Sequence, residues 1–215
     1  MLFADLDLSS LEPHLEPINN LLIKPGITVY RQGEEGNAIY SIRKGLIKLV
    51  QSTPEGIERI VHLAGPGSCI GMEGFLHNSY SQSAESITEV DICAIPVDAA
   101  QKIAQAQSAL YKALLTRWQN QFGVAERWML ELSQGTVRQK LARLLLMLDE
   151  LGNTHGQIRL LNNQDSAGIV ASTVETVSRN IAEFKREGAL LKIAPSLYQI
   201  DYARLQHYAV TGESL

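Results

Sequence analysis

The feature that most restricts the fold of this 215-residue chain is an uneven distribution of glycine. Nine of the sixteen glycines lie between residues 26 and 74, and short segments rich in β-branched residues separate them. Segments of this kind, with a turn about every ten residues, are typical of a compact antiparallel β-structure. We therefore expect an N-terminal antiparallel β-roll of the jelly-roll type, preceded by a short helix over residues 7–18. Its strands are predicted at residues 27–32, 38–45, 46–53, 57–64 and 91–97.

The pattern changes after Pro96, because no further proline and only one glycine, Gly123, occur before residue 134. Apolar side chains then recur at alternating intervals of three and four residues, which predicts a helix over residues 108–133. Its apolar face is broad enough to contact both the β-domain and a second copy of the helix. The alternative is a long core helix that lies across its own domain. We favour homodimerisation through Leu114, Trp118, Gln121, Phe122, Ala125, Trp128, Met129 and Leu132.

The last third of the chain has the pattern of a winged helix-turn-helix. A break at residues 133–135 precedes an amphipathic helix that we expect to end at a glycine cap, Gly152. A short strand, a pair of helices over residues 163–188 and two strands around a Pro-Ser turn follow. The predicted fold is therefore α+β. Its expected parts are a sensor domain (residues 1–107), a dimerisation helix with a hinge (108–135) and a DNA-binding domain (136–215).

The net charge of −4 is unevenly distributed. Residues 1–136 carry 10 basic and 15 acidic side chains, a net charge of −5, and residues 137–215 carry 9 and 8, a net charge of +1. This asymmetry is compatible with a regulatory module followed by a DNA-binding module. No apolar run approaches the roughly 20 residues of a membrane span, and no targeting signal is visible. We expect a cytoplasmic protein that has no membrane partner.

The second helix of the predicted pair carries side chains that suit base recognition. Ser172 or Thr173 begins this helix, and Ser172 with Glu175 fits the capping-box pattern. Arginine can bond guanine, glutamate can accept from cytosine, and hydroxyls can reach bases or phosphates. The candidate DNA contacts are Thr173, Glu175, Thr176, Ser178 and Arg179, with Lys185 and Arg186 suited to phosphate. In the alternative interpretation Glu175 is only a capping residue, and Arg179 pairs with Glu175 or Glu183.

The sequences TVETVSR at residues 173–179 and EFKREGAL at 183–190 resemble the recognition helix of FNR-type regulators in the CRP/FNR family. The resemblance extends over residues 17–205 and includes the β-roll hairpins. It implies a homodimeric transcription regulator, an activator with RNA polymerase as partner, whose Glu175, Ser178 and Arg179 read a TTGA-type palindromic operator in double-stranded DNA. Ala171 and Ser166 depart from the family pattern, which has glycine and an apolar residue there. We expect Ala171 to adopt a right-handed turn at small cost.

The resemblance also directs attention to an effector cradle formed by Gly71, Met72, Glu73, Gln82 and Ser83. Family members that bind cyclic nucleotides use a Gly-Glu pair and an Arg-Ser phosphate clamp there. Met72 and Gln82 replace the glutamate and the arginine, so a cyclic phosphate would lack its charge-assisted partner. We therefore expect no cyclic AMP binding. The two cysteines also cannot hold the four-cysteine iron–sulfur cluster of FNR itself.

Several modes of control stay open. Haem is one, with His14, His62 or His77 as axial ligand, although each histidine is also accounted for by a structural or solvated role. A metabolite, oxidation of Cys69 or Cys93, and no effector at all are the others. A cupin-like enzyme or ligand-binding protein is the remote alternative. Because a metal cupin needs a paired His-x-His motif, which the sequence lacks, we expect neither a metal site nor catalysis.

Overall fold

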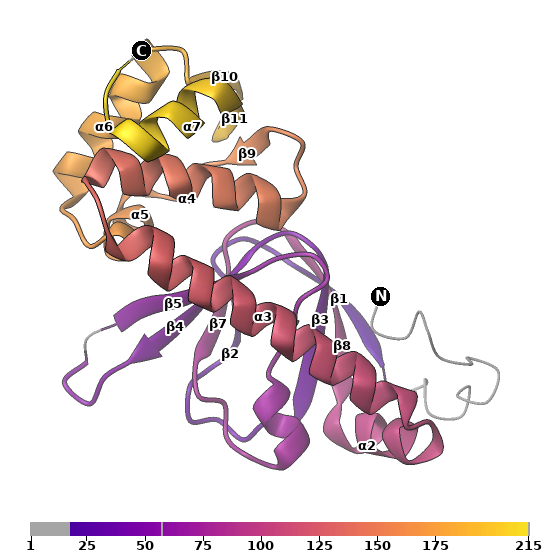
Figure 1. Cartoon of the computed structure of the whole chain (residues 1–215). Coiled ribbons are helices and arrows are strands. Elements are labelled where there is room, and N and C mark those ends of the chain that lie inside the picture. Colours follow the sequence, from indigo (N-terminus) through magenta and orange to yellow (C-terminus); the bar gives the residue numbers. More distant parts are fainter. Residues whose placement is uncertain (1–17, 57, 215) are drawn as a thin grey trace. The chain divides into compact units, whose positions relative to one another are not determined.

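A computed structural model of the chain describes residues 18–56 and 58–214 (Figure 1). The chain divides into two compact units, of which the first ends at Val124 and the second begins at Ala125. The short helix predicted over residues 7–18 lies outside the described residues except for Ile18. Among the helices that are described, none is both long and apolar enough to span a membrane.

The first unit contains two four-stranded antiparallel sheets, which confirms the predicted β-roll. The strand orders are β1-β8-β3-β6 and β2-β7-β4-β5. The short strands β1, β6 and β7 were not predicted, because β1 is exposed along most of its length and the other two have no more than four residues. The strands are β1 (Asn19–Ile23), β2 (Thr28–Tyr30), β3 (Ala38–Lys44), β4 (Ile47–Ser52), β5 (Glu58–Ala64), β6 (Cys69–Ile70), β7 (Ser83–Ser86) and β8 (Val90–Pro96).

Two apolar clusters form the core of this unit. In one, Ile42 and Ile92 pack with Tyr30 and Tyr80 between the sheets. In the other, Ile95 of β8 packs against helix α2 (Val97–Ala106) and the first turns of helix α3 (Ala109–Ser133). Each fully buried aliphatic side chain contributes about 1.5–3 kcal/mol to folding. Helix α3 therefore begins as part of the core of the first unit, at almost the position that the periodicity predicts.

The second unit is a winged helix-turn-helix. Its three-stranded sheet has the order β10-β11-β9. The predicted glycine cap of α4 is wrong: Gly152 is the last helical residue, and Asn153 takes the left-handed capping conformation with φ 48°, which asparagine tolerates. The final helix, α7, was not predicted. The elements are α4 (Val137–Gly152), β9 (Gln157–Arg159), α5 (Asn163–Val170), α6 (Val174–Arg186), β10 (Leu190–Ala194), β11 (Leu197–Ile200) and α7 (Tyr202–Thr211).

The segment between α3 and α4, expected to be a hinge, is fastened within the second unit. The guanidinium of Arg143 donates to the carbonyl oxygens of Glu131 at 2.8 Å and Gln134 at 2.9 Å. It also donates to the carbonyl of Ala209 on α7. One side chain thus ties the end of α3 to both α4 and α7.

Candidate nucleic-acid interface

Helices α5 and α6 form the helix-turn-helix, joined by three residues. Ala171 is left-handed, with φ 50° and ψ 60°, so the expected right-handed turn is wrong. The helix needs this conformation to end sharply, and an alanine adopts it at a cost of about 1–2 kcal/mol. Thr173 caps α6, and its Oγ1 accepts from the backbone N–H of Thr176 at 3.2 Å. The capping box based on Ser172 is therefore also wrong.

Two buried cations on α4 hold the helix pair in place. The Lys140 ammonium donates to the carbonyl oxygen of Val170, the last residue of α5, where a positive charge suits the helix C-terminus. The Arg138 guanidinium pairs with Glu183 of α6 at 3.0 Å and with Glu187, the residue that caps the end of α6. Sequence reasoning missed both cations, since local spacing does not reveal pairs that are 30 to 49 residues apart.

Arg138 also lies over two aromatic rings. Its guanidinium carbon is 5.0 Å from the centroid of Phe184 on α6 and 4.4 Å from that of Tyr208 on α7. These two rings stack on each other with centroids 5.3 Å apart. The C-terminal half of α6 is therefore fixed to α4 and α7 by ionic and aromatic contacts together.

Helix α6 presents one polar face to solvent. Val177, Ile181 and Phe184 are buried on the opposite face, whereas the predicted readers Glu175, Ser178 and Arg179 are exposed. Within the described part of the chain, no ion pair or hydrogen bond engages Arg179. Among the described residues, Arg179 pairs with neither Glu175 nor Glu183, and the Glu183 carboxylate pairs with Arg138 instead.

The remaining predicted contacts lie at the two ends of α6. The Thr176 hydroxyl is 3.1 Å from that of Thr173, so both belong to the helix cap. Arg186 is exposed in the last turn. Lys185 is also exposed, and its ammonium lies 4.7 Å from the ring centroid of Tyr198 on β11. The last turn of α6 and the wing thus adjoin each other and carry positive charge.

Asp149, near the end of α4, anchors the base of the wing. Its carboxylate accepts from the Thr154 hydroxyl and the Gly156 N–H, both at 2.6 Å, and from the Tyr202 hydroxyl. Burial alone would raise the pKa of Asp149, but these hydrogen bonds outweigh burial and lower the pKa. The charged carboxylate therefore links α4, the β9 loop and α7.

The two segments that carry the predicted cradle residues are joined by hydrogen bonds between Glu73 and Ser81. Gly71 is left-handed, with φ 72°, and precedes the short 3-10 helix η2 (Met72–Leu76). The Glu73 carboxylate accepts from the backbone and hydroxyl of Ser81, which brings η2 beside Gln82 and Ser83 at the start of β7. The Ser83 hydroxyl oxygen accepts from the backbone N–H of Gln32 at 2.9 Å.

A stack of tyrosines adjoins the cradle. Tyr30 lies between Tyr80, at a centroid distance of 4.0 Å, and Tyr40, at 5.5 Å. A Cβ atom placed on Gly71 would lie 3.0 Å from the Tyr80 ring. Burial raises the pKa of both Tyr30 and Tyr40, so their hydroxyls stay neutral. The side chains that pack on Gly71 are thus neutral tyrosines, which offer no positive charge to a cyclic phosphate.

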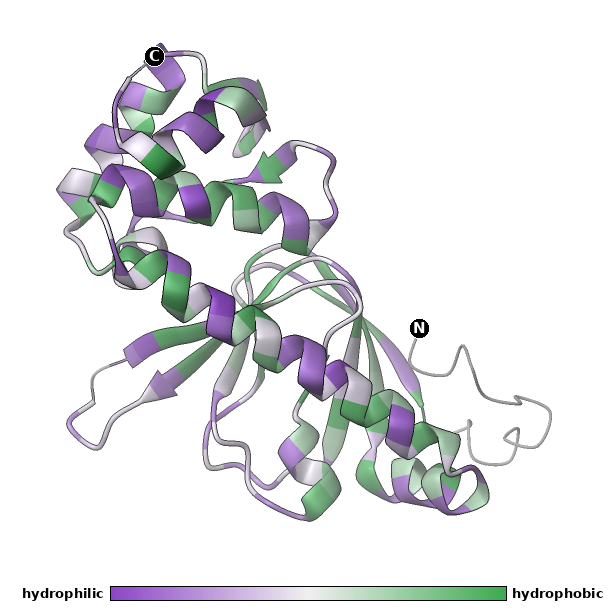
Figure 2. Ribbon diagram, in the orientation of Figure 1, coloured by the Kyte–Doolittle hydropathy of each residue, from purple (hydrophilic) through white to green (hydrophobic). Residues whose placement is uncertain are grey.

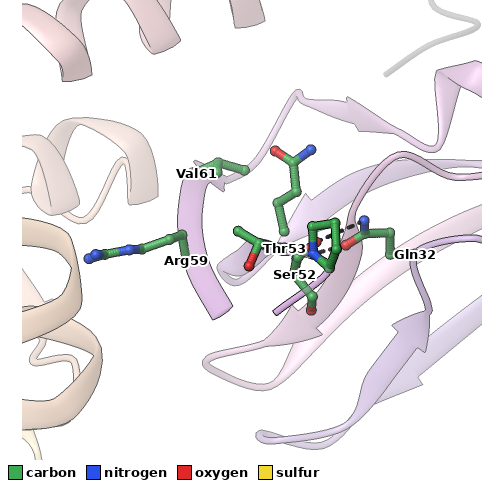
Figure 3. A pocket seen from close by; sticks show the side chains of 7 residues that line it. Gln32, Ser52, Thr53, Arg59 and Val61 are labelled. Atoms are coloured by element: carbon green, nitrogen blue, oxygen red, sulfur yellow. Dashed lines mark hydrogen bonds between the residues drawn. The ribbon is translucent and has the colours of Figure 1, made fainter. Parts of the chain in front are cut away.

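A shallow depression of about 750 Å³ lies on the β4–β5 hairpin (Figure 3). Gln32 closes one side, and its carboxamide pairs with both the N–H and the carbonyl of Ser52, at 2.8 and 3.2 Å. Figure 3 shows that the Arg59 side chain extends away from Gln32 and Ser52. The polar lining groups do not point toward one another, so the depression does not indicate a class of ligand.

Both cysteines lie opposite the same residue, Ser41 on β3: Cys69 on β6 and Cys93 on β8. Because adjacent strands are about 4.8 Å apart, the Cα atoms of the two cysteines are about 10 Å apart. A disulfide requires less than about 7 Å. Burial also raises the pKa of Cys69 to about 11, so this thiol is protonated. The two cysteines cannot form a disulfide with each other in this fold.

The candidate haem ligands occupy different environments. His62 on β5 is buried, and its Nδ1 has no hydrogen-bond partner in the described structure. His77 is exposed at the end of η2, with Nε2 2.8 Å from the side-chain nitrogen of Gln101. His14 lies outside the described residues. Residues 18–56 and 58–214 contain no group of three or more potential ligand side chains placed to hold a metal ion.

Helix α3 carries two apolar stripes, one buried and one exposed. Along α3, Figure 2 shows green apolar segments alternating with purple polar ones. Leu114, Trp128 and Leu132, which were predicted to face a partner, are buried within the chain. Trp118, Phe122 and Met129, also predicted, are 61–64% exposed. Gln121 and Ala125 are half-buried. The residues of the exposed stripe are Tyr111, Leu115, Trp118, Phe122 and Met129.

Two protein families match the chain, one in each unit. Residues 21–107 match the cyclic nucleotide-binding domain, and residues 139–208 match the Crp-like helix-turn-helix domain. These two segments contain the cradle and helix α6, respectively.

Curated and solved relatives agree with the two matches. The transcriptional activator protein anr of Pseudomonas aeruginosa is 24% identical over 85% of this chain and 77% of its own length. The structure of FixK2 from Bradyrhizobium japonicum has a TM-score of 0.75 at 21% identity and covers 88% of this chain and 96% of that one. TTHB099, a CRP-family transcriptional regulator from Thermus thermophilus, has a TM-score of 0.74 at 25% identity, with coverages of 91% and 98%.

Proposed function

Since the chain belongs to the CRP/FNR family of transcriptional regulators, with a cyclic nucleotide-binding domain followed by a Crp-like helix-turn-helix domain, we propose that it binds a TTGA-type palindromic operator as a homodimer and activates transcription. The observation that carries this proposal is the exposed polar face of α6. Arg179 has no partner among residues 18–56 and 58–214, while Arg138 binds α6 on the side away from solvent. A transcriptional regulator of this kind is not an enzyme.

Arg179 reads guanine in this proposal, Glu175 accepts from cytosine, and Ser178 contacts a neighbouring base. Lys185 and Arg186 bind phosphate, and Thr173 and Thr176 set the start of the helix. Arg179→Ala is expected to relax discrimination at the guanine of TTGA by about 1–3 kcal/mol. The control Lys185→Ala is expected to lower the affinity for all DNA sequences alike and to reduce the salt dependence of binding. Competition binding against single-base operator variants at fixed salt tests both. If Arg179→Ala lost the same affinity for every operator variant, Arg179 would be a phosphate contact and not a base contact.

The exposed stripe of α3 supports dimerisation. Its side chains repeat at heptad-like intervals, and a monomer that left them in water would be unusual, since stripes of this kind form coiled-coil seams. Phe122→Glu would place two like charges in that seam and is expected to yield monomers. Asn120→Glu changes an exposed position outside the stripe and is the matched control. Sedimentation of both variants at micromolar concentration tests the assignment. A dimeric Phe122→Glu protein would refute it.

We infer that control does not come from cyclic AMP at the cradle. Met72 and Gln82 offer no positive charge to a phosphate, and the neutral tyrosines Tyr40 and Tyr80 lie beside Gly71. Calorimetric titration with cyclic AMP is expected to show no saturable heat. Transcription from a TTGA promoter with purified RNA polymerase, with and without added cyclic AMP, is expected to show activation that is independent of the nucleotide.

A further inference from the structure

The chain turns back on itself directly after α7, and local contacts hold this turn. Gly212 ends the helix in a left-handed conformation, with φ 74°. A Cβ atom on Gly212 would lie 3.2 Å from Gln139 and from Thr136 at the start of α4, so glycine suits both the dihedral angle and the close approach. The Thr211 hydroxyl oxygen accepts from the backbone N–H of Glu213 at 3.1 Å. These contacts set the direction of the residue that follows.

The turn brings Ser214 to the end of the recognition helix. The Ser214 hydroxyl donates to the carboxylate of Glu187, the residue that caps α6, with 3.0 Å between the oxygens. The same hydroxyl oxygen accepts from the Arg138 guanidinium at 3.2 Å, and that guanidinium also pairs with Glu187. Ser214, Glu187 and Arg138 thus form a closed ring of hydrogen bonds that joins α4, the end of α6 and the segment after α7.

The charges around this ring suit a small neutral hydroxyl group. Arg138 carries one positive charge, whereas Glu183 and Glu187 supply two negative charges. Burial alone would raise the pKa of Glu187, but its hydrogen bonds, including the one from Ser214, lower the pKa and keep the carboxylate charged. A serine can donate to this carboxylate and accept from the guanidinium at the same time, without adding a charge.

We propose that Ser214 is a positioning residue for the recognition helix, because it bridges Glu187 and Arg138 and so holds the last turn of α6 in place. Ser214 makes no contact with DNA in this inference, which rests on the proposed function of α6 as the reading helix. Water competes for both of its hydrogen bonds, since Ser214 is exposed. The expected effect is therefore moderate, about three-fold, as for one net hydrogen bond.

Amide hydrogen exchange of the full chain without DNA tests the contact itself. The backbone N–H of Ala189 donates to the carbonyl of Phe184 at 2.8 Å, so its exchange reports opening of the last turn of α6. Ser214→Ala is expected to raise this exchange rate about three-fold, whereas Ser214→Thr keeps the hydroxyl and is expected to keep the parent rate. Glu213→Ala, which removes an exposed side chain outside the ring, is the matched control. A parent rate in Ser214→Ala would overturn the proposal.

Ser214→Asp tests the electrostatic part of the proposal. The new carboxylate would face Glu183 and Glu187 and would compete with them for Arg138, so exchange is expected to be about ten-fold faster than in the parent protein. Gln206→Glu adds the same charge to an exposed position of α7 and is expected to keep the parent rate. Exchange in Ser214→Asp that is no faster than in Ser214→Ala would contradict this arrangement of charges and with it the proposal.

Operator binding tests the link between the ring and recognition. The affinity of Ser214→Ala for a TTGA duplex is expected to fall about three-fold while its affinity for a scrambled duplex is unchanged, because base contacts depend on helix placement more than phosphate contacts do. Ser214→Thr is expected to restore the parent affinity. Equal losses on both duplexes would overturn the inference.

These outcomes separate the inference from its premise. If the parent protein does not prefer the TTGA duplex over the scrambled one, the proposed operator is wrong, and hydrogen exchange then decides by itself whether Ser214 holds α6. If the parent protein prefers that duplex but Ser214→Ala matches the parent in exchange and in affinity, the role of Ser214 is wrong while the proposed function stands.

Discussion

Arg138 of α4 and Glu183 of α6 form an ion pair with 3.0 Å between guanidinium and carboxylate. The Arg138 side chain is only 11% exposed. The ion pair therefore lies where little water can solvate it, and each charge is stabilised mainly by its partner. It fastens α6 to α4 and engages the carboxylate that lies one helical turn after Arg179. Among the described residues, Arg179 has no ion-pair partner.

Replacing Arg138 by methionine is expected to destabilise the second unit by about 3 kcal/mol, because Glu183 and Glu187 would remain half-buried without a counter-charge. Urea unfolding of the variant measures the loss. Arg127→Met is the control, since its ion pair with Glu150 is largely exposed and is expected to contribute less than about 1 kcal/mol. Equal losses in the two variants would contradict the role of Arg138.

Ala171→Gly is expected to stabilise the second unit by about 1 kcal/mol. The left-handed conformation at φ 50° strains an alanine but not a glycine, and this gain exceeds the entropy that glycine loses on folding. The shift of the thermal midpoint measures the effect. A destabilised Ala171→Gly protein would show that the turn is not left-handed in solution.

Gly74→Ala is expected to destabilise the first unit by about 2 kcal/mol through overpacking. The new Cβ atom would lie 2.6 Å from the carbonyl oxygen of Gly36, so backbone would have to move. Gly123→Ala is the control, because its added methyl group meets no described atom within 4 Å apart from its chain neighbours and the backbone of its own helix; it is expected to be neutral or stabilising. Denaturant unfolding compares the two. Equal stability of the Gly74→Ala and parent proteins would mean that η2 does not pack on Gly36.

The stability of the first unit is expected to fall between pH 6.5 and pH 4 because of His62. Burial lowers the pKa of His62 to about 4 from its ordinary 6.5. Between these two pH values the imidazole is protonated in the unfolded chain but neutral in the folded one, so acid favours unfolding. The contribution of neutral His62 to the free energy of unfolding is fully present above pH 6.5 and decreases by about 3 kcal/mol on acidification to pH 4. Unfolding curves across this range measure it, and His62→Leu is expected to lack this component. An unchanged pH profile in His62→Leu would exclude His62 as its source.

Local patterns in the sequence were sufficient for the elements and their order. Glycine spacing predicted the long strands of the β-roll, and a period of three and four residues predicted α3 to within one residue of its observed start. The candidate reading residues also follow from sequence, because helix periodicity alone places Glu175, Ser178 and Arg179 near one another on α6. Each of these conclusions depends on residues a few positions apart, and the chain encodes such relations directly.

Tertiary structure decided which of those side chains are free to act. The sequence could not separate the two stripes of α3, since burial of Leu114 depends on β3 and β8, strands distant in sequence, whereas Trp118 meets no such neighbour. The sequence also could not show that Arg138 pairs with Glu183, that Lys140 donates to the last carbonyl of α5, or that tyrosines pack beside Gly71. Periodicity fixes the direction of a side chain on its own helix or strand, but what it meets there depends on elements that only folding brings together.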